Sequence, residues 1–442
     1  MKISFTSVVL LLSLIFFSAC SDIDNTGENV VGGNFVSAEV IEDINTSTML
    51  SIVKASINPS ATVAFGYKAV KITYDTQDQL GNSVEASGLL VIPSASTEYQ
   101  AYRVSQGESP FSVSMVCDNH GTIFTDADAP SNVEKTNGVP DYNLAALMTG
   151  YAGFAAVLPD YIGYGVSNDE AHPYMLKKAS ARASLDMIKA SVKYMTDNGV
   201  VFNGQLYISG YSQGGYTAMA LAEEIEKNHS DEFTVKALAP MAGPYDLKGL
   251  GDIEIDASHT MVYPAFLAYL ADSYSYFYSD LDITSLVNET NSTKYHALFD
   301  GSNSSVAIHT GLGLVTDARG GFNQHSADVL FQESAINDYQ NNVNSVLKEK
   351  LEQNSVYNWT PKTRVNLIHC SDDEIIPFSM SQTAYDTFIA NGASSLDVTL
   401  TPIPTVALSQ QQDASNPFIH GNCALDAYSV AVGWFSSIRG EK

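Results

Sequence analysis

Basic residues are scarce in this sequence of 442 residues. Only 22 lysines and arginines stand against 49 aspartates and glutamates, and the formal net charge is −27 at pH 7. So acidic a surface repels phosphate backbones and anionic lipid headgroups, which argues against nucleic acid and anionic membranes as direct partners. The composition is otherwise that of a globular protein, with 45% hydrophobic and 16% charged residues.

Cysteines are also few, namely Cys20, Cys117, Cys370 and Cys423. No pair of them has C-x-x-C spacing and the chain contains no H-E-x-x-H, so the sequence indicates no metal site and we expect no cofactor. With Cys20 set apart, an odd number remains, which leaves at least one free thiol. Cys370 and Cys423 could approach each other and form a disulfide, but we favour the interpretation that they are small buried residues.

A short apolar run marks the N-terminus. It covers residues 8–17, follows Lys2, and ends at Ser18-Ala19-Cys20. A charged start, a short apolar stretch and a small-residue cleavage site are typical of a signal peptide, and the run is too short to span a membrane. Because a cysteine occupies the cleavage position, residues 1–20 resemble a bacterial lipoprotein signal, with a plain secretory peptide as the alternative.

The lipoprotein resemblance implies a location. Cys20 becomes the lipidated first residue of the mature chain, and the following Ser21 and Asp22 resemble outer-membrane sorting and surface-export signals. We therefore expect a protein that is lipid-anchored to the bacterial outer membrane, on its periplasmic or cell-surface side. Residues 21–35 are polar and contain glycine, which predicts a flexible tether.

The most informative motif is Gly-Tyr-Ser-Gln-Gly at residues 210–214, a G-x-S-x-G pentapeptide. An apolar strand pattern precedes it at 205–209, and a helix pattern follows it at 215–225. Strand, sharp turn and helix are the context of a nucleophile elbow, which strains the serine backbone and needs glycines around it. We predict Ser212 as a nucleophile; an ordinary serine in a tight turn is the alternative.

Strands and helices alternate along most of the chain. An antiparallel pair at 70–74 and 84–92 is followed by strands at 113–117, 154–158, 205–209, 235–240, 365–368 and 396–400. This rhythm predicts an α/β fold with a mainly parallel, doubly wound sheet, formed by residues 36–246 and 362–442. Residues 247–361 interrupt it after the sixth predicted strand and are rich in aromatics, so we expect a helical cap or lid over the active site. A packing subdomain with its own aromatic core is the alternative.

The catalytic partners of Ser212 are predicted from position. A serine needs a histidine base, and a carboxylate must orient that histidine; in this kind of fold they follow in the order Ser, Asp or Glu, His. Asp373, after the strand at 365–368, takes the acid's place and Asp372 is its competitor. His420 is the one histidine after the last predicted strand.

An acyl-transfer site also needs two backbone N–H donors for the oxyanion. Gln213, directly after the nucleophile, should provide one of them. The second should come from a loop that follows a neighbouring strand, either Gly121 after the third or Asp160 after the fourth. Both positions stay open.

These motifs together resemble the α/β-hydrolase superfamily over residues 67–438, and within it the secretory lipase family of fungal lipase-A type and bacterial esterases. The shared features are the P-D-Y loop at 159–163, G-Y-S-x-G at 210–214, the D-E-I-x-P loop at 373–377 and a late histidine. In the lipase-A type, the residue matching Asp160 gives the second oxyanion amide, so the resemblance raises Asp160 beside Gly121. His120-Gly121 is a departure from the fungal pattern, so the choice between Asp160 and Gly121 as second donor stays open.

The resemblance implies a serine carboxylic ester hydrolase, an esterase or lipase, that acts through an acyl-enzyme on a small-molecule, lipid or glycan ester. Two alternatives are a serine peptidase of the prolyl-oligopeptidase type and a non-catalytic surface binding lipoprotein. The peptidases usually carry a large N-terminal domain, and only residues 21–69 lie between the expected signal peptide and the first predicted core strand here. Candidate substrate contacts are Tyr211, Tyr161, Tyr276 and Phe277. The sequence is silent on oligomeric state.

Overall fold

The structure is a computed structural model that describes most of the chain between residues 33 and 439. The described ranges are 33–56, 58–62, 64–105, 112–132, 146–289, 292–314, 326–405 and 418–439. The expected signal peptide with Cys20, and most of the expected tether, lie outside them. Main-chain pairing begins at Gly33, whose N–H donates to the carbonyl of Asp75 at 2.8 Å. That pairing starts inside the range 21–35 that we expected to be a tether.

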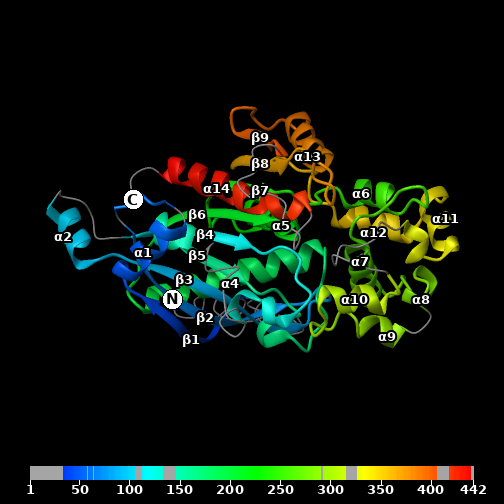
Figure 1. Ribbon diagram of the computed structural model, residues 1–442, viewed down its shortest axis with the longest axis horizontal. Coiled ribbons are helices and arrows are strands. Elements are labelled where there is room, and N and C mark those ends of the chain that lie inside the picture. The colour runs from blue at the N-terminus through cyan, green and yellow to red at the C-terminus, as the bar shows by residue number, and fades with distance from the viewer. Residues whose placement is uncertain are drawn as a thin grey trace, which may run out of the picture. The chain divides into compact units, whose positions relative to one another are not determined.

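One sheet of nine strands forms the centre of the described part of the chain (Figure 1). The pairs β1–β2, β2–β3 and β3–β5 are antiparallel, and the pairs from β5 through β4 to β9 are parallel. The predicted mainly parallel, doubly wound sheet is thereby confirmed. In sheet order the strands are β1 (Phe35–Ile44), β2 (Gly66–Gln77), β3 (Ser83–Ser94), β5 (Ala155–Pro159), β4 (Val113–Asn119), β6 (Phe202–Tyr211), β7 (Val235–Met241), β8 (Arg364–Cys370) and β9 (Val398–Ile403).

Helices cover both faces of the sheet and enclose two apolar cores. On one face, α4 (Lys177–Asp197), α5 (Gln213–Asn228) and α13 (Ser379–Ala390) pack against the strands. On the other, the helices are α1 (Thr46–Ser56), the π-helix η3 (Ala146–Tyr151) and α14 (Ile419–Arg439). Because both faces are covered, the central strands are largely buried; all seven residues of β4 are buried, the polar ones included. Three short elements connect these layers: α2 (Thr97–Ser105), η1 (Asp126–Asp128) and η4 (Gly165–Ser167).

The first strand, β1, was missed by the sequence analysis. It lies at the edge of the sheet, pairs with β2 alone, and has no fully buried residue. A strand without a buried face shows no alternation of apolar and polar residues, so its pattern could not be recognised. The predicted insertion therefore follows the seventh strand, β7, rather than the sixth.

Helices make up the inserted segment between β7 and β8. In Figure 1 they gather at the right-hand end of the sheet. The same apolar core that lies under α4 and α5 runs on into them, so the insertion has no separate core. The helices are α6 (Leu247–Glu254), α7 (Pro264–Phe277), α8 (Ile283–Leu286), α9 (Ser292–His296), α10 (Ser305–Gly311), η5 (Ala327–Val329), α11 (Glu333–Asn341) and α12 (Val346–Asn354).

Stacked aromatic rings fix this segment to the loops of the sheet. Tyr269 of α7 stacks on Tyr174 at 4.5 Å between ring centroids and on Phe299 at 4.8 Å. Its hydroxyl also lies 2.8 Å from that of Tyr164, which belongs to the loop after β5. The aromatics of the inserted segment thus pack within it and against the sheet domain at once.

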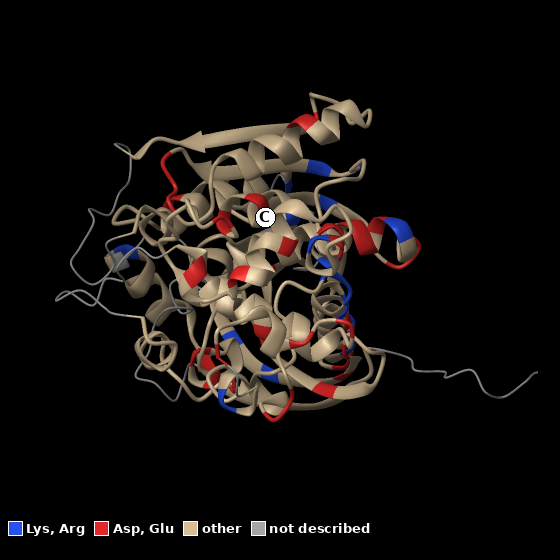
Figure 2. Ribbon diagram, turned by 90° about the vertical axis from the view of Figure 1, so that its right-hand side faces the viewer, with Lys and Arg blue, Asp and Glu red and all other residues tan. Residues whose placement is uncertain are grey.

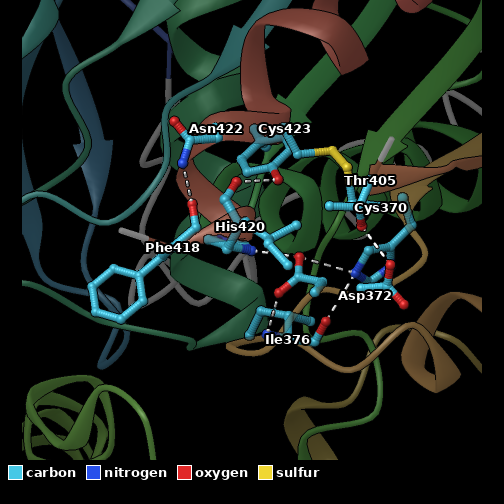
Figure 3. Close-up of a disulfide and its surroundings, with 12 residues drawn as sticks. Cys370, Asp372, Ile376, Thr405, Phe418, His420, Asn422 and Cys423 are labelled. Atoms are coloured by element: carbon cyan, nitrogen blue, oxygen red, sulfur yellow. Dashed lines mark hydrogen bonds and ion pairs between the residues drawn. A yellow bond between two sulfur atoms is a disulfide. The ribbon is translucent and has the colours of Figure 1, made fainter. Parts of the chain in front are cut away.

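Cys370 and Cys423 form a disulfide, which corrects the interpretation that we had favoured (Figure 3). It joins the end of β8 to the first turns of α14, two segments that are 53 residues apart in sequence. Cys117 on β4 is buried and free. The pairing could not be derived from sequence because it depends on where α14 crosses the sheet.

Acidic residues are spread along the ribbon in Figure 2, where they are coloured red, and lysines and arginines are coloured blue. This agrees with the excess of acidic residues in the sequence. Within the described ranges, no helix is both long and apolar enough to cross a membrane. In the same residues, no group of three or more histidine, cysteine or acidic side chains could hold a metal ion.

Candidate active site

Ser212 lies on the sharp turn between β6 and α5, with φ of 60° and ψ of −121°. This left-handed conformation is strained for a serine and is held by close packing of the turn. A Cβ atom on Gly214 would lie 1.7 Å from the carbonyl oxygen of Asn119, and one on Gly210 would lie 2.2 Å from the carbonyl of Gly214. Only glycines fit at these positions, so the turn has the geometry predicted for a nucleophile elbow.

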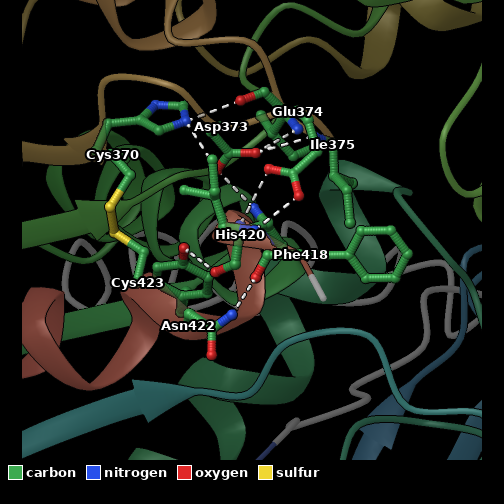
Figure 4. Close-up of polar contacts among 12 residues, drawn as sticks. Cys370, Asp373, Glu374, Ile375, Phe418, His420, Asn422 and Cys423 are labelled. Atoms are coloured by element: carbon green, nitrogen blue, oxygen red, sulfur yellow. Dashed lines mark hydrogen bonds and ion pairs between the residues drawn. A yellow bond between two sulfur atoms is a disulfide. The ribbon is translucent and has the colours of Figure 1, made fainter. Parts of the chain in front are cut away.

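Asp373 and His420 form a buried hydrogen-bonded pair (Figure 4). The Nδ1–H of His420 donates to Oδ2 of Asp373 at 2.6 Å, while Oδ1 accepts the N–H groups of Ile375 and Ile376. Burial alone would raise the pKa of Asp373, but the charge of His420 and hydrogen bonds from His369 and His420 hold it well below its usual value. The carboxylate therefore stays ionised next to the imidazole.

Asp372, the competing acid, points away from the histidine (Figure 3). It is exposed, and its carboxylate accepts the hydroxyl of Thr405. The structure thus brings Asp373 and not Asp372 to His420.

A second histidine also contacts Asp373, and sequence reasoning missed it. Nε2 of His369 lies 3.3 Å from Oδ2 of Asp373 and 2.9 Å from the carbonyl of Ile376, and Nδ1 lies 2.8 Å from the hydroxyl of Ser381. The sequence analysis considered a histidine only after the last predicted strand, whereas His369 belongs to β8. The signal that could have found it is its spacing, four residues before the acid on the same turn.

Tyr211 connects His420 to the nucleophile turn. Its hydroxyl donates to the carbonyl of His420 at 2.6 Å, and the two ring centroids are 5.0 Å apart. Since Tyr211 directly precedes Ser212, this contact places His420 beside the elbow. Tyr211 is buried and does not line the cavity next to Ser212, so the structure does not support the substrate contact that we expected for it.

The Asp160 amide is not free to serve an oxyanion. Its N–H donates to the carbonyl of Ser87 at 2.9 Å, as part of the pairing between β3 and β5. Its carboxylate is also occupied, by the hydroxyl of Ser87 and by the hydroxyl and N–H of Ser131. The prediction of Asp160 as a donor is therefore wrong in this structure, because a strand pairing already uses the group.

Gly121 lies directly against the elbow. A Cβ atom on it would be 3.3 Å from the carbonyl oxygen of Tyr211 and 3.8 Å from Cβ of Ser212. Its N–H has no hydrogen-bond partner within the described part of the chain. The neighbouring His120 is stacked on Tyr161 at 4.2 Å, and the Tyr161 hydroxyl donates to its carbonyl at 3.2 Å. Tyr161 therefore supports this loop and does not line the cavity as expected.

Gln213, the other expected donor, is the first residue of α5 and is fixed by its side chain. Its Nε2 donates to Nε2 of His172 at 2.9 Å, and Nδ1–H of His172 donates to the carbonyl of Ile162 at 2.7 Å. Burial lowers the pKa of His172 to about 3, so this histidine is neutral and can accept the bond. The backbone at the start of α5 is thereby held in place.

A cavity of about 80 Å³ opens beside Ser212 under the inserted helices. Glu254, Glu374 and the rings of Tyr174 and Tyr263 are its other polar lining residues. Its apolar walls come mainly from α6, α7 and the loop after β8: Met175, Pro244, Leu247, Leu250, Met261, Val262, Phe266, Leu267, Leu270, Leu351, Ile375 and Ile376.

Tyr276 and Phe277, two expected substrate contacts, do not line this cavity. They stand at the far end of α7, about ten residues beyond Phe266, which corresponds to about 15 Å along the helix. Tyr276 is 54% exposed and Phe277 is buried. The aromatic composition of the segment was informative, but only the first half of α7 faces Ser212.

Solved structures with lipase and esterase activity share this fold. The rice cell wall degrading esterase LipA from Xanthomonas oryzae matches with a TM-score of 0.73 and 23% identity, over 91% of this chain and 97% of its own. Lipase A from Candida antarctica, in its closed state, matches with a TM-score of 0.56 and 14% identity, over 90% of each chain. A protein from Legionella pneumophila matches with a TM-score of 0.74 and 22% identity, over 92% of this chain and 99% of its own.

These likenesses show that the chain has the α/β-hydrolase fold. A search of curated protein sequences found no match. The family model described as secretory lipase matches residues 139–405, which is more than half of the chain and includes both the serine elbow and the acid loop. The chain therefore belongs to the secretory lipase family.

Proposed function

We propose that this ester hydrolase uses Ser212, Asp373 and His420 as a catalytic triad and acts through an acyl-enzyme. The observation that carries the proposal is the buried bond of 2.6 Å between Nδ1 of His420 and Asp373, on a histidine that Tyr211 ties to the serine turn. The bond fixes the tautomer with its proton on Nδ1, which leaves Nε2 free to act as a base.

In the first half of the reaction, Nε2 of His420 takes the proton of Ser212 as its Oγ attacks the ester carbonyl. The ionised Asp373 stabilises the imidazolium that forms. The carbonyl oxygen becomes an oxyanion, and we assign its donors to the N–H groups of Gln213 and Gly121. When the tetrahedral intermediate collapses, His420 gives its proton to the leaving alcohol and the acyl group stays on Ser212.

In the second half, water replaces the alcohol. His420 removes a proton from the water, the hydroxide attacks the acyl-enzyme carbonyl, and the same two N–H groups receive the second oxyanion. Collapse returns the proton to Ser212 and releases the carboxylic acid. The apolar walls of the cavity suit an apolar acyl group and exclude water from the intermediate.

An active-site fluorophosphonate, combined with Ser212→Ala, tests the triad. The probe should label the parent at Ser212, and Ser212→Ala should lose at least about a thousandfold in hydrolysis of p-nitrophenyl butyrate. Ser209→Ala is a matched control, because Ser209 is a buried serine on the same strand whose hydroxyl donates to Asp118. Labelling that persists in Ser212→Ala would contradict the proposal, and preferential cleavage of aminoacyl anilides would favour a peptidase.

We further propose that Cys20 carries the lipid that anchors the protein to the outer membrane, facing the periplasm or the outside. The support is the leader that ends in Ser18-Ala19-Cys20 and the following tether. A protein with a net charge of −27 has little electrostatic attraction to anionic membranes, so the lipid on Cys20 would have to provide the membrane attachment.

A further inference from the structure

The main chain of His420 is bonded on both sides by groups outside its own helix. His420 is the second residue of α14, where the first N–H groups of a helix have no partner within the helix. A histidine at a helix end is held less firmly than one inside a strand, so its position depends on contacts from other segments. Two side chains provide them, Glu374 and Tyr211.

Glu374 occupies the N–H side. Its carboxylate accepts the N–H of Ile419 at 2.7 Å and lies 3.4 Å from the N–H of His420. Figure 4 shows it next to Asp373, against the start of α14. A carboxylate at a helix N-terminus satisfies free N–H groups and interacts favourably with the helix dipole. The loop after β8 thus makes two contacts with the start of α14: Asp373 bonds the side chain of His420, and Glu374 bonds the backbone N–H groups of Ile419 and His420.

Tyr211 occupies the carbonyl side. Its hydroxyl donates to the carbonyl of His420 at 2.6 Å, and its ring lies against the imidazole. Tyr211 directly precedes Ser212, so this bond joins the backbone of His420 to the residue next to the nucleophile. The contact therefore restrains His420 relative to the turn that carries the serine, as well as the start of α14.

We propose that Tyr211 and Glu374 are positioning residues that clamp the backbone of His420, so that its Nε2 is held in line with Ser212. The proposal rests on the proposed triad. Tyr211 does not line the cavity, and Glu374, which does, has its carboxylate bonded to the N–H groups of Ile419 and His420. Neither residue exchanges a proton in the proposed reaction, so their loss should lower kcat through misplacement of the base. Displacing a reacting group by about 1 Å can lower the rate about a hundredfold.

Tyr211→Phe tests the clamp, since it removes one hydroxyl and keeps the ring. We expect kcat for p-nitrophenyl butyrate to fall about tenfold or more while KM stays within about twofold, because Tyr211 does not line the cavity. The matched control is Tyr74→Phe. The Tyr74 hydroxyl also donates to a buried carbonyl, that of Ala183 at 2.9 Å, but on β2, away from the triad. This control should lose stability and keep kcat.

Glu374→Ala tests the other side independently, should Tyr211→Phe fail to fold. It should lower kcat, and Glu374→Gln should recover part of the loss because its amide oxygen can still accept the Ile419 N–H. Glu226→Ala is the control, since Glu226 accepts the backbone N–H groups of Lys362 and Thr363 far from the site. Its kcat should not change.

A normal kcat in both Tyr211→Phe and Glu374→Ala would overturn the clamp, and so would an equal loss in the controls Tyr74→Phe and Glu226→Ala. Those results leave the triad standing as long as Ser212→Ala is inactive. Full activity of Ser212→Ala would instead remove the proposed function, whatever the clamp variants show. The two failures are therefore distinguishable in one set of measurements.

Discussion

Replacing Asp373 by asparagine tests the proposed triad most directly, because it exchanges one carboxylate oxygen for an amide nitrogen at constant size. In the structure, Oδ1 accepts the N–H groups of Ile375 and Ile376 at 3.0 and 2.8 Å, and Oδ2 accepts Nδ1–H of His420 at 2.6 Å. To keep the first two bonds, the asparagine must leave its oxygen at Oδ1 and turn its NH₂ group towards His420.

Two donors cannot bond each other, so His420 would move its proton from Nδ1 to Nε2 and accept the new N–H. The proton would then occupy the nitrogen that has to receive the proton of Ser212. We expect kcat/KM to fall about 10³- to 10⁴-fold, equivalent to about 4–5.5 kcal/mol of transition-state stabilisation. The opposite orientation would leave two buried N–H groups facing a donor, at about 1–3 kcal/mol each, and would appear as a lowered Tm.

Asp372→Asn is the matched control. Asp372 is exposed and bonds Thr405, so its replacement should leave kcat/KM for p-nitrophenyl butyrate within about twofold of the parent. Fluorophosphonate labelling of both variants reports whether Ser212 is still accessible. An inactive Asp372→Asn beside an active Asp373→Asn would refute the reasoning.

Three further predictions concern the cavity, the fold and the anchor. Phe266→Ala should enlarge the cavity and raise the ratio of kcat/KM for an octanoyl ester to that for a butyryl ester about tenfold. Tyr276→Ala, outside the cavity, should leave this ratio unchanged. The same ratio in both variants would show that the inserted segment does not determine the choice of substrate. Burial raises the pKa of Asp186 to about 6, so this acid binds its proton more tightly in the folded chain than in the unfolded chain. As the pH rises from about 4 to 6, the buried carboxyl group increasingly destabilises the folded state. Asp186→Asn should therefore raise the free energy of unfolding at pH 7.5 by up to about 3 kcal/mol, seen as a higher Tm, and should change it little at pH 4. An equal rise at both pH values would contradict the raised pKa of Asp186. Cys20→Ser should move the protein from the membrane to the soluble fraction or block its maturation, and a parent found only in the soluble fraction would exclude the anchor.

Local patterns account for what the sequence could predict. The G-x-S-x-G turn is recognised together with the strand before it and the helix after it, which all lie within about 25 residues. Buried parallel strands such as β4 and β6 each carry a short stretch rich in apolar residues, so the strands and their order along the chain followed from the sequence pattern. Asp373 and His420 were then predicted from the strands that they follow in the sequence.

Contacts between distant segments account for what it could not predict. The N–H of Asp160 is taken by Ser87, because β3 and β5 are neighbours in the sheet although 60 residues of chain lie between them. The Tyr211 hydroxyl reaches a carbonyl 209 residues away. Such partners depend on strand order and helix placement, which no motif encodes. A tyrosine in the elbow is equally compatible with binding substrate and with holding the histidine.

The serine and the histidine of the proposed triad are held in place by different physical means. Ser212 is fixed by its own backbone, since its φ of 60° and the glycines around it leave the turn one conformation. His420 lies in the first turn of α14, the last helix of the described chain, and the N–H groups of a first turn have no partners within the helix. It therefore depends on the Cys370–Cys423 disulfide, on the loop acids and on Tyr211. Substitutions that impair catalysis without touching substrate should consequently concentrate around His420 rather than around Ser212.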